Sequence, residues 1–269
     1  MVGAAHAPAP PVPRTPAEGA RRGGPQLPQR PPGRAGDPGG GPRRGAGWGP
    51  PGGRAPDPPR LKVAVDVDEV LAQFLRSLNA YVRDEHGLAF EVADYSVYYF
   101  AAIWGCPPDV SNERVHAFFQ SEHFRSGVEP IPGALEALTR LRATCDLEVV
   151  TSRQHVIERP TLDWLDAHFP GVFDAVHFGN HFALEGGSRK KSEICRDIGA
   201  HVLVDDNPGY ALDCAEEGID VMLFDWNLGY PWAKTEAGPV HPKITRVADW
   251  AGLCVELEAL AAALAAAGA

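Results

Sequence analysis

Apolar and polar residues alternate after residue 60 in a way that predicts short strands separated by helices. β-branched apolar runs predict strands at 61–66, 147–150, 175–178, 201–204 and 219–224. Apolar residues at helical spacing predict helices at 69–82, 112–120, 133–141, 160–169, from 192, at 208–217 and from 248. This alternation is typical of an α/β fold, a parallel sheet with helices on both faces.

The first 60 residues differ in composition from the rest. They contain 14 Gly and 16 Pro, and nine Arg against three acidic residues give a local charge of +6. So few apolar side chains cannot offset the entropy lost on folding, which predicts a disordered tail at 1–60. The tail lacks an apolar signal core and, although Arg-rich like a transit peptide, has no serine. We expect a cytoplasmic or organellar protein, not a secreted one. A plain tail, a targeting segment and RNA contact stay open.

Charge and cysteine content argue against several function classes. The chain carries a formal charge of −10, and the part after residue 60 carries −16, which argues against a dedicated nucleic-acid partner. The five cysteines include no CxxC pair, which disfavours a disulfide framework or a zinc site. No run of about 18 consecutive apolar residues occurs, so we expect no membrane-spanning helix.

Polar residues stand where the predicted strands end or the next helix begins. In chain order they are Asp66, Asp68, Thr151, Ser152, Arg153, Lys191, Asp205 and Asp206. Ligands bind beyond the carboxyl ends of parallel strands, so we expect these side chains to converge on one edge of the sheet. Acidic residues also favour loops and helix N-termini for purely structural reasons, and this alternative applies most to Asp206.

The set suits phosphoryl transfer through a carboxylate. One Asp would attack phosphorus to form an aspartyl-phosphate, and a second, two residues on, would protonate the leaving oxygen and then activate water. Two anions approach a phosphate only with a hard cation between them, which predicts Mg²⁺. Thr151, Ser152 and Lys191 would hold the remaining phosphoryl oxygens. Asp205 would bind the ion, and Asp206 would bind it through water or orient the other ligands.

Four short motifs resemble those of the haloacid dehalogenase (HAD) superfamily. They are DVDEV at 66–70, VVTS at 149–152, Lys191, and LVDD at 203–206. Within that superfamily, the DVDEVL opening and the KSEIC…VDDNP stretch are similar to the cytosolic and mitochondrial 5′(3′)-deoxyribonucleotidase family. The similarity spans about residues 61–250.

The resemblance implies a Rossmann-like core with a small helical cap inserted after the first strand. It further implies that Asp66 is the nucleophile and Asp68 the general acid/base. Mg²⁺ would be held by the Asp66 side chain, the Asp68 backbone carbonyl and Asp205, with Asp206 as a further metal-site candidate. Because related nucleotidases dimerise, a homodimer is possible.

The spacing of the motifs agrees with an insertion. Asp66 and Thr151 are 85 residues apart, whereas a crossover between parallel strands needs only about a dozen. We therefore predict a HAD-like core from 61–71 and 131–269 and a helical cap from 72–130.

Aromatic residues are concentrated in the insertion, where 71–124 hold 11 of the chain's 23. Such side chains either form a small core or stack on a flat leaving group such as a nucleobase. The stacking candidates are Phe74, Tyr98, Tyr99, Phe100 and Trp104. Phe74 is favoured, because in the nucleotidases that the chain resembles an aromatic residue eight positions after the nucleophile stacks on the base.

One position departs from the nucleotidase pattern. The nucleotidases usually have Pro after the Thr-Ser pair, where this chain has Arg153 and Gln154. A cation beside the phosphate would favour a second anionic group or a leaving group of different shape. The candidates for binding the substrate are therefore Phe74, Trp104 and Arg153. His177 and His181 are open between lining the pocket and lying elsewhere.

Three functions follow in order of preference. The first is a Mg²⁺-dependent phosphomonoester hydrolase that acts on nucleoside 5′-monophosphates, in particular deoxyribonucleotides. The second is a HAD phosphatase of sugar phosphates or another small phosphorylated metabolite. The third, from a different class, is a catalytically idle domain that binds a ligand or a protein.

Overall fold

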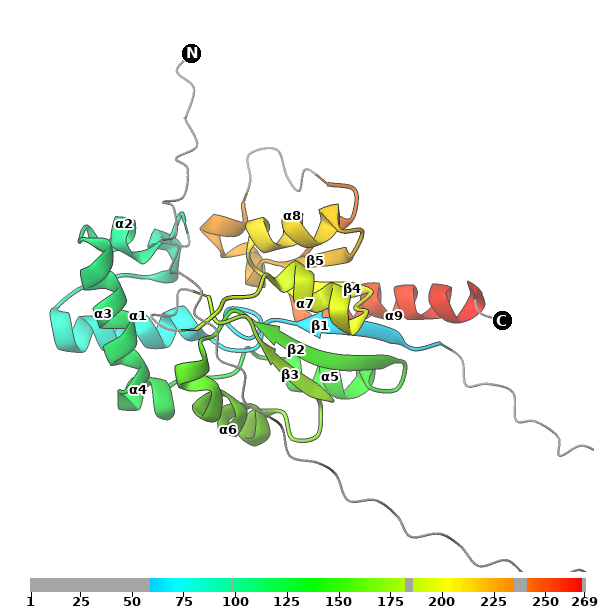
Figure 1. The fold of residues 1–269 in the computed structure, drawn as a ribbon, viewed down its shortest axis with the longest axis horizontal. Coiled ribbons are helices and arrows are strands. Elements are labelled where there is room, and N and C mark those ends of the chain that lie inside the picture. Colours follow the sequence, from blue (N-terminus) through cyan, green and yellow to red (C-terminus); the bar gives the residue numbers. More distant parts are fainter. Residues whose placement is uncertain (1–58, 98, 182–185, 235–240, 268–269) are drawn as a thin grey trace, which may run out of the picture. The chain divides into compact units, whose positions relative to one another are not determined.

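A single parallel sheet organises the chain (Figure 1). The computed structural model describes residues 59–97, 99–181, 186–234 and 241–267. The predicted disordered tail, apart from its last two residues, and the stacking candidate Tyr98 lie outside the described residues. The described residues belong to one compact unit, Ala55–Ala269, which includes both the sheet and the insertion.

The sheet has the order β3-β2-β1-β4-β5-β6, and every neighbouring pair is parallel. Its strands are β1 (Leu61–Val65), β2 (Cys145–Thr151), β3 (Ala175–Phe178), β4 (Val202–Asp205), β5 (Asp220–Phe224) and β6 (Ile244–Val247). The predicted Rossmann-like α/β class is confirmed. The short edge strand β6 was missed, because Thr245 and Arg246 interrupt its apolar character.

Helices cover both faces of the sheet, and a further group lies beyond the strands (Figure 1). That group consists of α2 (Phe100–Trp104), α3 (Pro108–Phe119) and α4 (Glu122–Arg125), which pack with one another and with α1 (Phe74–His86). The other helices are α5 (Ala134–Leu141), α6 (Glu158–His168), α7 (Lys191–Ile198), α8 (Pro208–Glu216) and α9 (Trp250–Ala267). Neighbouring residues of β1 enter opposite cores, as a strand buried on both faces requires. Val63 belongs to the hydrophobic core that includes residues of α1, α5, α6 and α9, whereas Ala64 belongs to the core that includes residues of α7 and α8.

The predicted helix from residue 69 begins later, at Phe74. Glu69 has a φ of 60°, a backbone conformation that no α-helix contains. The Val67 carbonyl accepts hydrogen bonds from the backbone N–H groups of Leu71 and Ala72, which closes a tight loop instead. This loop is the reason that Asp68 and Phe74 both face the cavity described below.

α9 is the one helix among the described residues that is long and apolar enough to cross a membrane. The search for unbroken apolar runs did not single out α9, because Glu256 and Glu258 interrupt it. Length and composition decide little for one helix. Here α9 packs one face against α5, β1 and β6, and Arg140 of α5 binds Glu258 at 2.6 Å.

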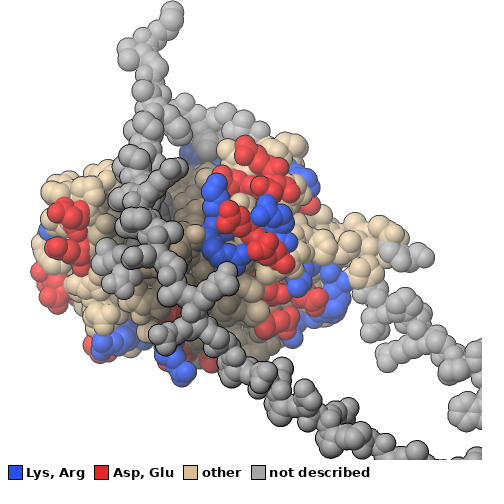
Figure 2. Space-filling model, viewed as in Figure 1, with Lys and Arg blue, Asp and Glu red and all other residues tan. Residues whose placement is uncertain are grey.

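Acidic and basic side chains are intermixed on the face of the molecule shown in Figure 2. No broad basic surface of the kind that tracks a phosphate backbone appears among the described residues on that face.

Candidate active site

Three charged residues meet where β1 and β4 end. Val65 and Val204 are paired in the sheet, so the residues that follow them, Asp66 and Asp205, reach the same edge. The Asp66 backbone N–H donates to the Val204 carbonyl at 3.0 Å. Lys191, the first residue of α7, lies between the two carboxylates. Its Nζ is 2.7 Å from Asp66 Oδ2 and 2.6 Å from Asp205 Oδ2.

A third carboxylate, Asp206, completes a buried acidic cluster. One oxygen each from Asp66, Asp205 and Asp206 lie within 4.8 Å of one another. Asp66 Oδ1 is buried and accepts no hydrogen bond from the described residues. An oxygen-rich set with an unsatisfied buried acceptor fits a hard divalent cation such as Mg²⁺.

Burial sets the electrostatics of this cluster. Desolvation, with added repulsion from the carboxylates of Asp205 and Asp68, raises the pKa of Asp66 to about 7 against the opposing effect of Lys191. Desolvation and the same kind of repulsion place the pKa of Asp206 well above its usual range. Burial alone would lower the pKa of Lys191, but its two carboxylate partners outweigh burial and raise it. The lysine is therefore a fixed positive charge in an acidic site.

An aromatic segment after β5 supports the cluster from behind. Trp232 Nε1 donates to Asp206 Oδ2 at 2.8 Å, and its ring stacks on Tyr230 with centroids 4.5 Å apart. The Tyr230 hydroxyl donates to the Glu69 carbonyl at 3.0 Å, which ties this segment to the loop that carries Asp68. Sequence reasoning missed this contribution, because nothing in the chain's periodicity links residue 230 to residue 69.

Asp68, the predicted acid/base, is paired with Arg153. Arg153 Nη2 donates to Asp68 Oδ1 at 2.7 Å, and Nε lies 3.1 Å from Oδ1 and 3.2 Å from Oδ2. The Arg153 side chain is only 3% exposed. Arg153 lines the cavity, as a substrate-binding candidate should, but its guanidinium is paired with an internal carboxylate, so its role toward the substrate stays a prediction.

The two hydroxyl candidates follow β2 but have different surroundings. Thr151 is fully buried, and its Oγ1 accepts a hydrogen bond from the Arg153 backbone N–H at 3.2 Å. Ser152 lines the cavity, whereas Lys191 and Asp205 are buried behind Asp66. Of the candidates for holding the phosphate, Ser152 is thus the one exposed to the cavity.

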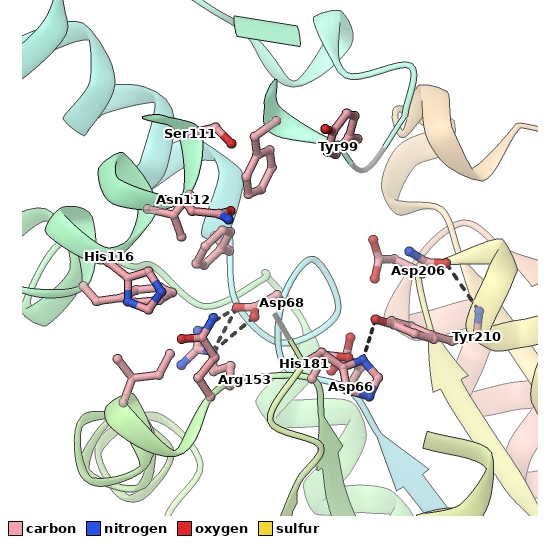
Figure 3. Close-up of a pocket in the computed structure, with 18 of the residues that line it drawn as sticks. Asp66, Asp68, Tyr99, Ser111, Asn112, His116, Arg153, His181, Asp206 and Tyr210 are labelled. Atoms are coloured by element: carbon pink, nitrogen blue, oxygen red, sulfur yellow. Dashed lines mark hydrogen bonds and ion pairs between the residues drawn. The ribbon is translucent and has the colours of Figure 1, made fainter. Parts of the chain in front are cut away.

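A cavity of about 260 Å³ opens in front of Asp66, Asp68 and Asp206. Figure 3 shows these acidic residues on one side and Tyr99, Ser111 and Asn112 of the insertion on the other. The lining residues are Asp66, Asp68, Phe74, Tyr99, Phe100, Pro108, Ser111, Asn112, Val115, His116, Phe119, Ser152, Arg153, Gln154, Ile157, His181, Asp206, Asn207 and Tyr210. The insertion therefore supplies one wall of the site.

The aromatic candidates divide between this wall and the interior. Phe74, Tyr99 and Phe100 line the cavity, and the edge of Phe74 packs on Phe118 with centroids 5.5 Å apart. Trp104 does not line it, which corrects its assignment to substrate binding. Its ring stacks on Phe100 from the inside and its Nε1 donates to the Tyr95 hydroxyl at 3.1 Å. An amphipathic helix pattern cannot distinguish these two environments.

The two histidine candidates also separate. His181 lines the cavity and its Nδ1 is 2.8 Å from the Tyr210 hydroxyl (Figure 3). Lys191 Nζ lies over the Tyr210 ring, 4.7 Å from its centroid. His177 is instead paired with Glu148 at 2.7 Å, within the sheet and away from the cavity lining. Asn112, Ser111 and His116 were not predicted as site residues, since no motif marks them.

Comparison with solved structures agrees with this fold. A haloacid dehalogenase-like hydrolase from Streptococcus pneumoniae superposes with a TM-score of 0.52 at 13% identity, over 75% of this chain and 98% of that one. A predicted phosphatase from Clostridium acetobutylicum gives 0.54 at 13% identity, over 74% and 99%. At such low identity these likenesses establish the fold alone.

Sequence comparison is more specific. Residues 60–219 match the family described as "5' nucleotidase, deoxy (Pyrimidine), cytosolic type C protein". The human mitochondrial 5'(3')-deoxyribonucleotidase is 34% identical over 178 residues, which cover 62% of this chain and 69% of the relative. Together with the strand-end carboxylates, these matches show that the chain belongs to the deoxy (pyrimidine) cytosolic type C 5′ nucleotidase family and is a phosphoric monoester hydrolase with a HAD-type fold.

Proposed function

We propose that this protein is a Mg²⁺-dependent nucleoside 5′-monophosphate phosphatase, acting on deoxyribonucleotides through an aspartyl-phosphate. The observation that carries the proposal is the cluster of Asp66, Asp205 and Lys191, in which Asp66 keeps one buried oxygen free of hydrogen bonds from the described residues. A nucleophile needs such an available oxygen. The positive charge of Lys191 beside it reduces the repulsion between the carboxylate and a phosphate dianion.

The residues divide the reaction into two steps. In the first, an Asp66 oxygen bonds to phosphorus while the bond from phosphorus to the ester oxygen breaks, and Asp68 gives its proton to that oxygen. In the second, Asp68 takes a proton from water as the water oxygen attacks phosphorus, which releases inorganic phosphate and restores Asp66.

Charge stabilisation comes from groups around the nucleophile. Lys191 is fixed as a cation, and Thr151 and Ser152 are the hydroxyl candidates for the non-transferred phosphoryl oxygens. Mg²⁺ bound by the Asp66 side chain, the Asp68 backbone carbonyl and Asp205 would neutralise phosphoryl charge as a Lewis acid, with Asp206 beside it. The acidic cluster supports that ligand set.

The insertion supports a flat leaving group. We propose that residues 72–130 act as a cap over the core formed by 61–71 and 131–269, and that Phe74 stacks on the nucleobase. Phe74 lies at the cavity wall, at the start of α1. The name of the human relative, a deoxyribonucleotidase, agrees with this choice of substrate.

The test is a phosphate-release screen with and without Mg²⁺. Deoxyribonucleoside 5′-monophosphates, 3′-monophosphates, ribonucleotides and a set of sugar phosphates would be compared by kcat/KM. We expect the 5′-deoxyribonucleotides to lead and chelation of the metal to abolish release. Highest turnover on sugar phosphates would favour the metabolite-phosphatase alternative, and no turnover on any substrate would favour the idle-domain alternative.

Assembly and compartment are further proposals. We propose a homodimer and a cytoplasmic or organellar location, by analogy with the family and with the mitochondrial relative. Light scattering behind size-exclusion chromatography tests the first. Localisation of the full chain beside a variant that lacks residues 1–60 tests the second.

A further inference from the structure

Arg153 occupies a position that the nucleotidase motif does not explain. Its guanidinium reaches three separate elements of the fold. It donates from Nε and Nη2 to Asp68, it donates from Nη1 to Thr161 Oγ1 of α6 at 3.1 Å, and it lies over the ring of Phe124 of α4 at 5.4 Å. A buried arginine with such contacts is held in one place.

The contact with Asp68 is asymmetric. Oδ1 accepts hydrogen bonds from Nη2, at 2.7 Å, and from Nε, at 3.1 Å, whereas Oδ2 accepts from Nε alone, at 3.2 Å. Each carboxylate oxygen has two acceptor sites, so Oδ2 keeps capacity for another partner. The pairing fixes the carboxylate through Oδ1 and leaves Oδ2 as the oxygen available for proton transfer.

The anchors of Arg153 are themselves fixed. The Thr161 hydroxyl donates to the Ile157 carbonyl at 2.7 Å, so its oxygen lone pairs face the arginine. Phe124 packs against Phe118 and Phe119, and Phe119 lines the cavity. The guanidinium therefore connects Asp68 to α6 and to the insertion.

We infer that Arg153 is a positioning residue. It holds the Asp68 carboxylate in the orientation needed for proton transfer to the leaving oxygen, and it connects that carboxylate to the helices of the insertion. The inference rests on the proposed function and adds a residue to it. Groups that orient an acid/base are expected to affect kcat more than KM, because they act on the reacting geometry and not on ground-state binding.

A second cavity, of about 370 Å³, gives the inference a sharp test. It lies beyond Arg153, which lines both cavities, and its other lining residues include Trp164, Arg125 and His168. Truncation of Arg153 to Ala removes the side chain that borders both spaces. Guanidinium from solution can then enter and take the place of the missing group.

The experiment compares wild type, Arg153→Ala, Arg153→Lys and the control Arg125→Ala, whose side chain lines the second cavity but contacts Glu122. We expect kcat of Arg153→Ala to fall about 10- to 100-fold on a 5′-deoxyribonucleotide with KM within about threefold of wild type. A smaller fall on p-nitrophenyl phosphate, whose leaving group needs no proton, would place the effect in the first step. An equal fall would place it in the second step, in which Asp68 activates water. Millimolar guanidinium at constant ionic strength should restore kcat several-fold in Arg153→Ala alone.

Loss of rescue when Asp68→Asn is added would show that the effect passes through Asp68. Rescue that persists in the double variant would overturn the inference, because the effect would then not pass through Asp68. If Arg153→Ala does not fold, Arg153→Lys and Thr161→Val are compared instead. Each of them weakens the hydrogen bonds made by the guanidinium but leaves a side chain of similar size in its place. In those variants, a kcat equal to that of wild type on both substrates would overturn it.

The proposed function is judged separately by wild type and Asp66→Asn. A wild type that releases no phosphate removes both claims. A wild type that is active, with Asp66→Asn inactive and Arg153→Ala unchanged, removes only the role of Arg153.

Discussion

The two sides of the cavity are built from different chemistry. On the sheet side, Asp66, Asp205 and Lys191 are almost completely buried, and Lys191 binds the two carboxylates at 2.7 and 2.6 Å. On the insertion side, the lining consists of aromatic rings and neutral polar groups, among them Tyr99, which is 53% exposed, and Asn112. The difference supports the proposal that the strand ends carry the reaction and that the insertion selects the leaving group.

The largest effect should come from the sheet side. Asp66→Asn removes the proposed nucleophile while keeping its size, so we expect phosphate release to fall at least about 1,000-fold. Asp146→Asn is the matched control, since Asp146 lies on the adjacent strand but binds Arg60 at the surface. Steady-state rates of phosphate release from one nucleotide, measured for wild type and both variants, test this expectation. Retained activity in Asp66→Asn would remove the sheet side from the chemistry.

Lys191 should matter for stability as well as for turnover. Lys191→Met leaves two buried carboxylates facing each other, which we expect to lower the free energy of unfolding by about 3–5 kcal/mol without metal. Added Mg²⁺ should recover part of the loss, because the ion takes over the lost positive charge. Urea titrations with Mg²⁺ and with chelator measure both values.

Lys62→Met is the control for that experiment. Lys62 binds Glu148 at 2.8 Å, but its side chain is 29% exposed, so its loss should cost at most about 1 kcal/mol. Equal losses for Lys62→Met and Lys191→Met, or no response of Lys191→Met to Mg²⁺, would contradict the arrangement described for the cluster.

Glu69 gives the next effect, through pH. Burial raises the pKa of Glu69 from 4.5 to about 7, so the folded protein binds this proton more tightly than the unfolded chain does. Stability from this group is present at low pH and is lost as pH rises from about 4.5 to 7. Glu69→Gln should therefore gain relative to wild type with rising pH, by up to about 3 kcal/mol at pH 8. A difference that is constant between pH 5 and pH 8 would refute this.

The smallest effect should come from the insertion side. Phe74→Leu keeps most of the apolar volume but removes the ring, so KM for a deoxyribonucleotide should rise about 5- to 10-fold. KM for a small alkyl phosphate should not change. Phe118→Leu is the control, because Phe118 packs on Phe74 and does not line the cavity. The same rise in both variants would indicate loss of packing and not loss of stacking.

The sheet side was largely predictable from sequence. A buried parallel strand has a strong apolar signal, and the polar residue after it, such as Asp66 or Asp205, must lie at the sheet edge. The separation of Asp66 from Thr151 likewise predicted an insertion. These predictions depend on local pattern and topology alone.

The insertion side was predicted less well, for physical reasons. Whether an aromatic side chain lines a cavity or a core depends on tertiary packing, so Trp104 was misassigned while Asn112 was overlooked. The pairing of Arg153 with Asp68 could not be predicted either, since the two residues are 85 positions apart. The sequence is equally compatible with an arginine that binds the substrate and one that pairs with an internal carboxylate. The positive φ of Glu69 likewise could not be foreseen from the apolar pattern, and it delays the start of the predicted helix to Phe74.

Acid quench of the enzyme during turnover of a radiolabelled deoxyribonucleotide tests the central claim most directly. We expect phosphate label on the wild-type protein that hydroxylamine releases, located by peptide mapping at residue 66, and absent from Asp66→Asn. Rapid turnover by wild type with no trapped label, together with unreduced turnover by Asp66→Asn, would contradict the account.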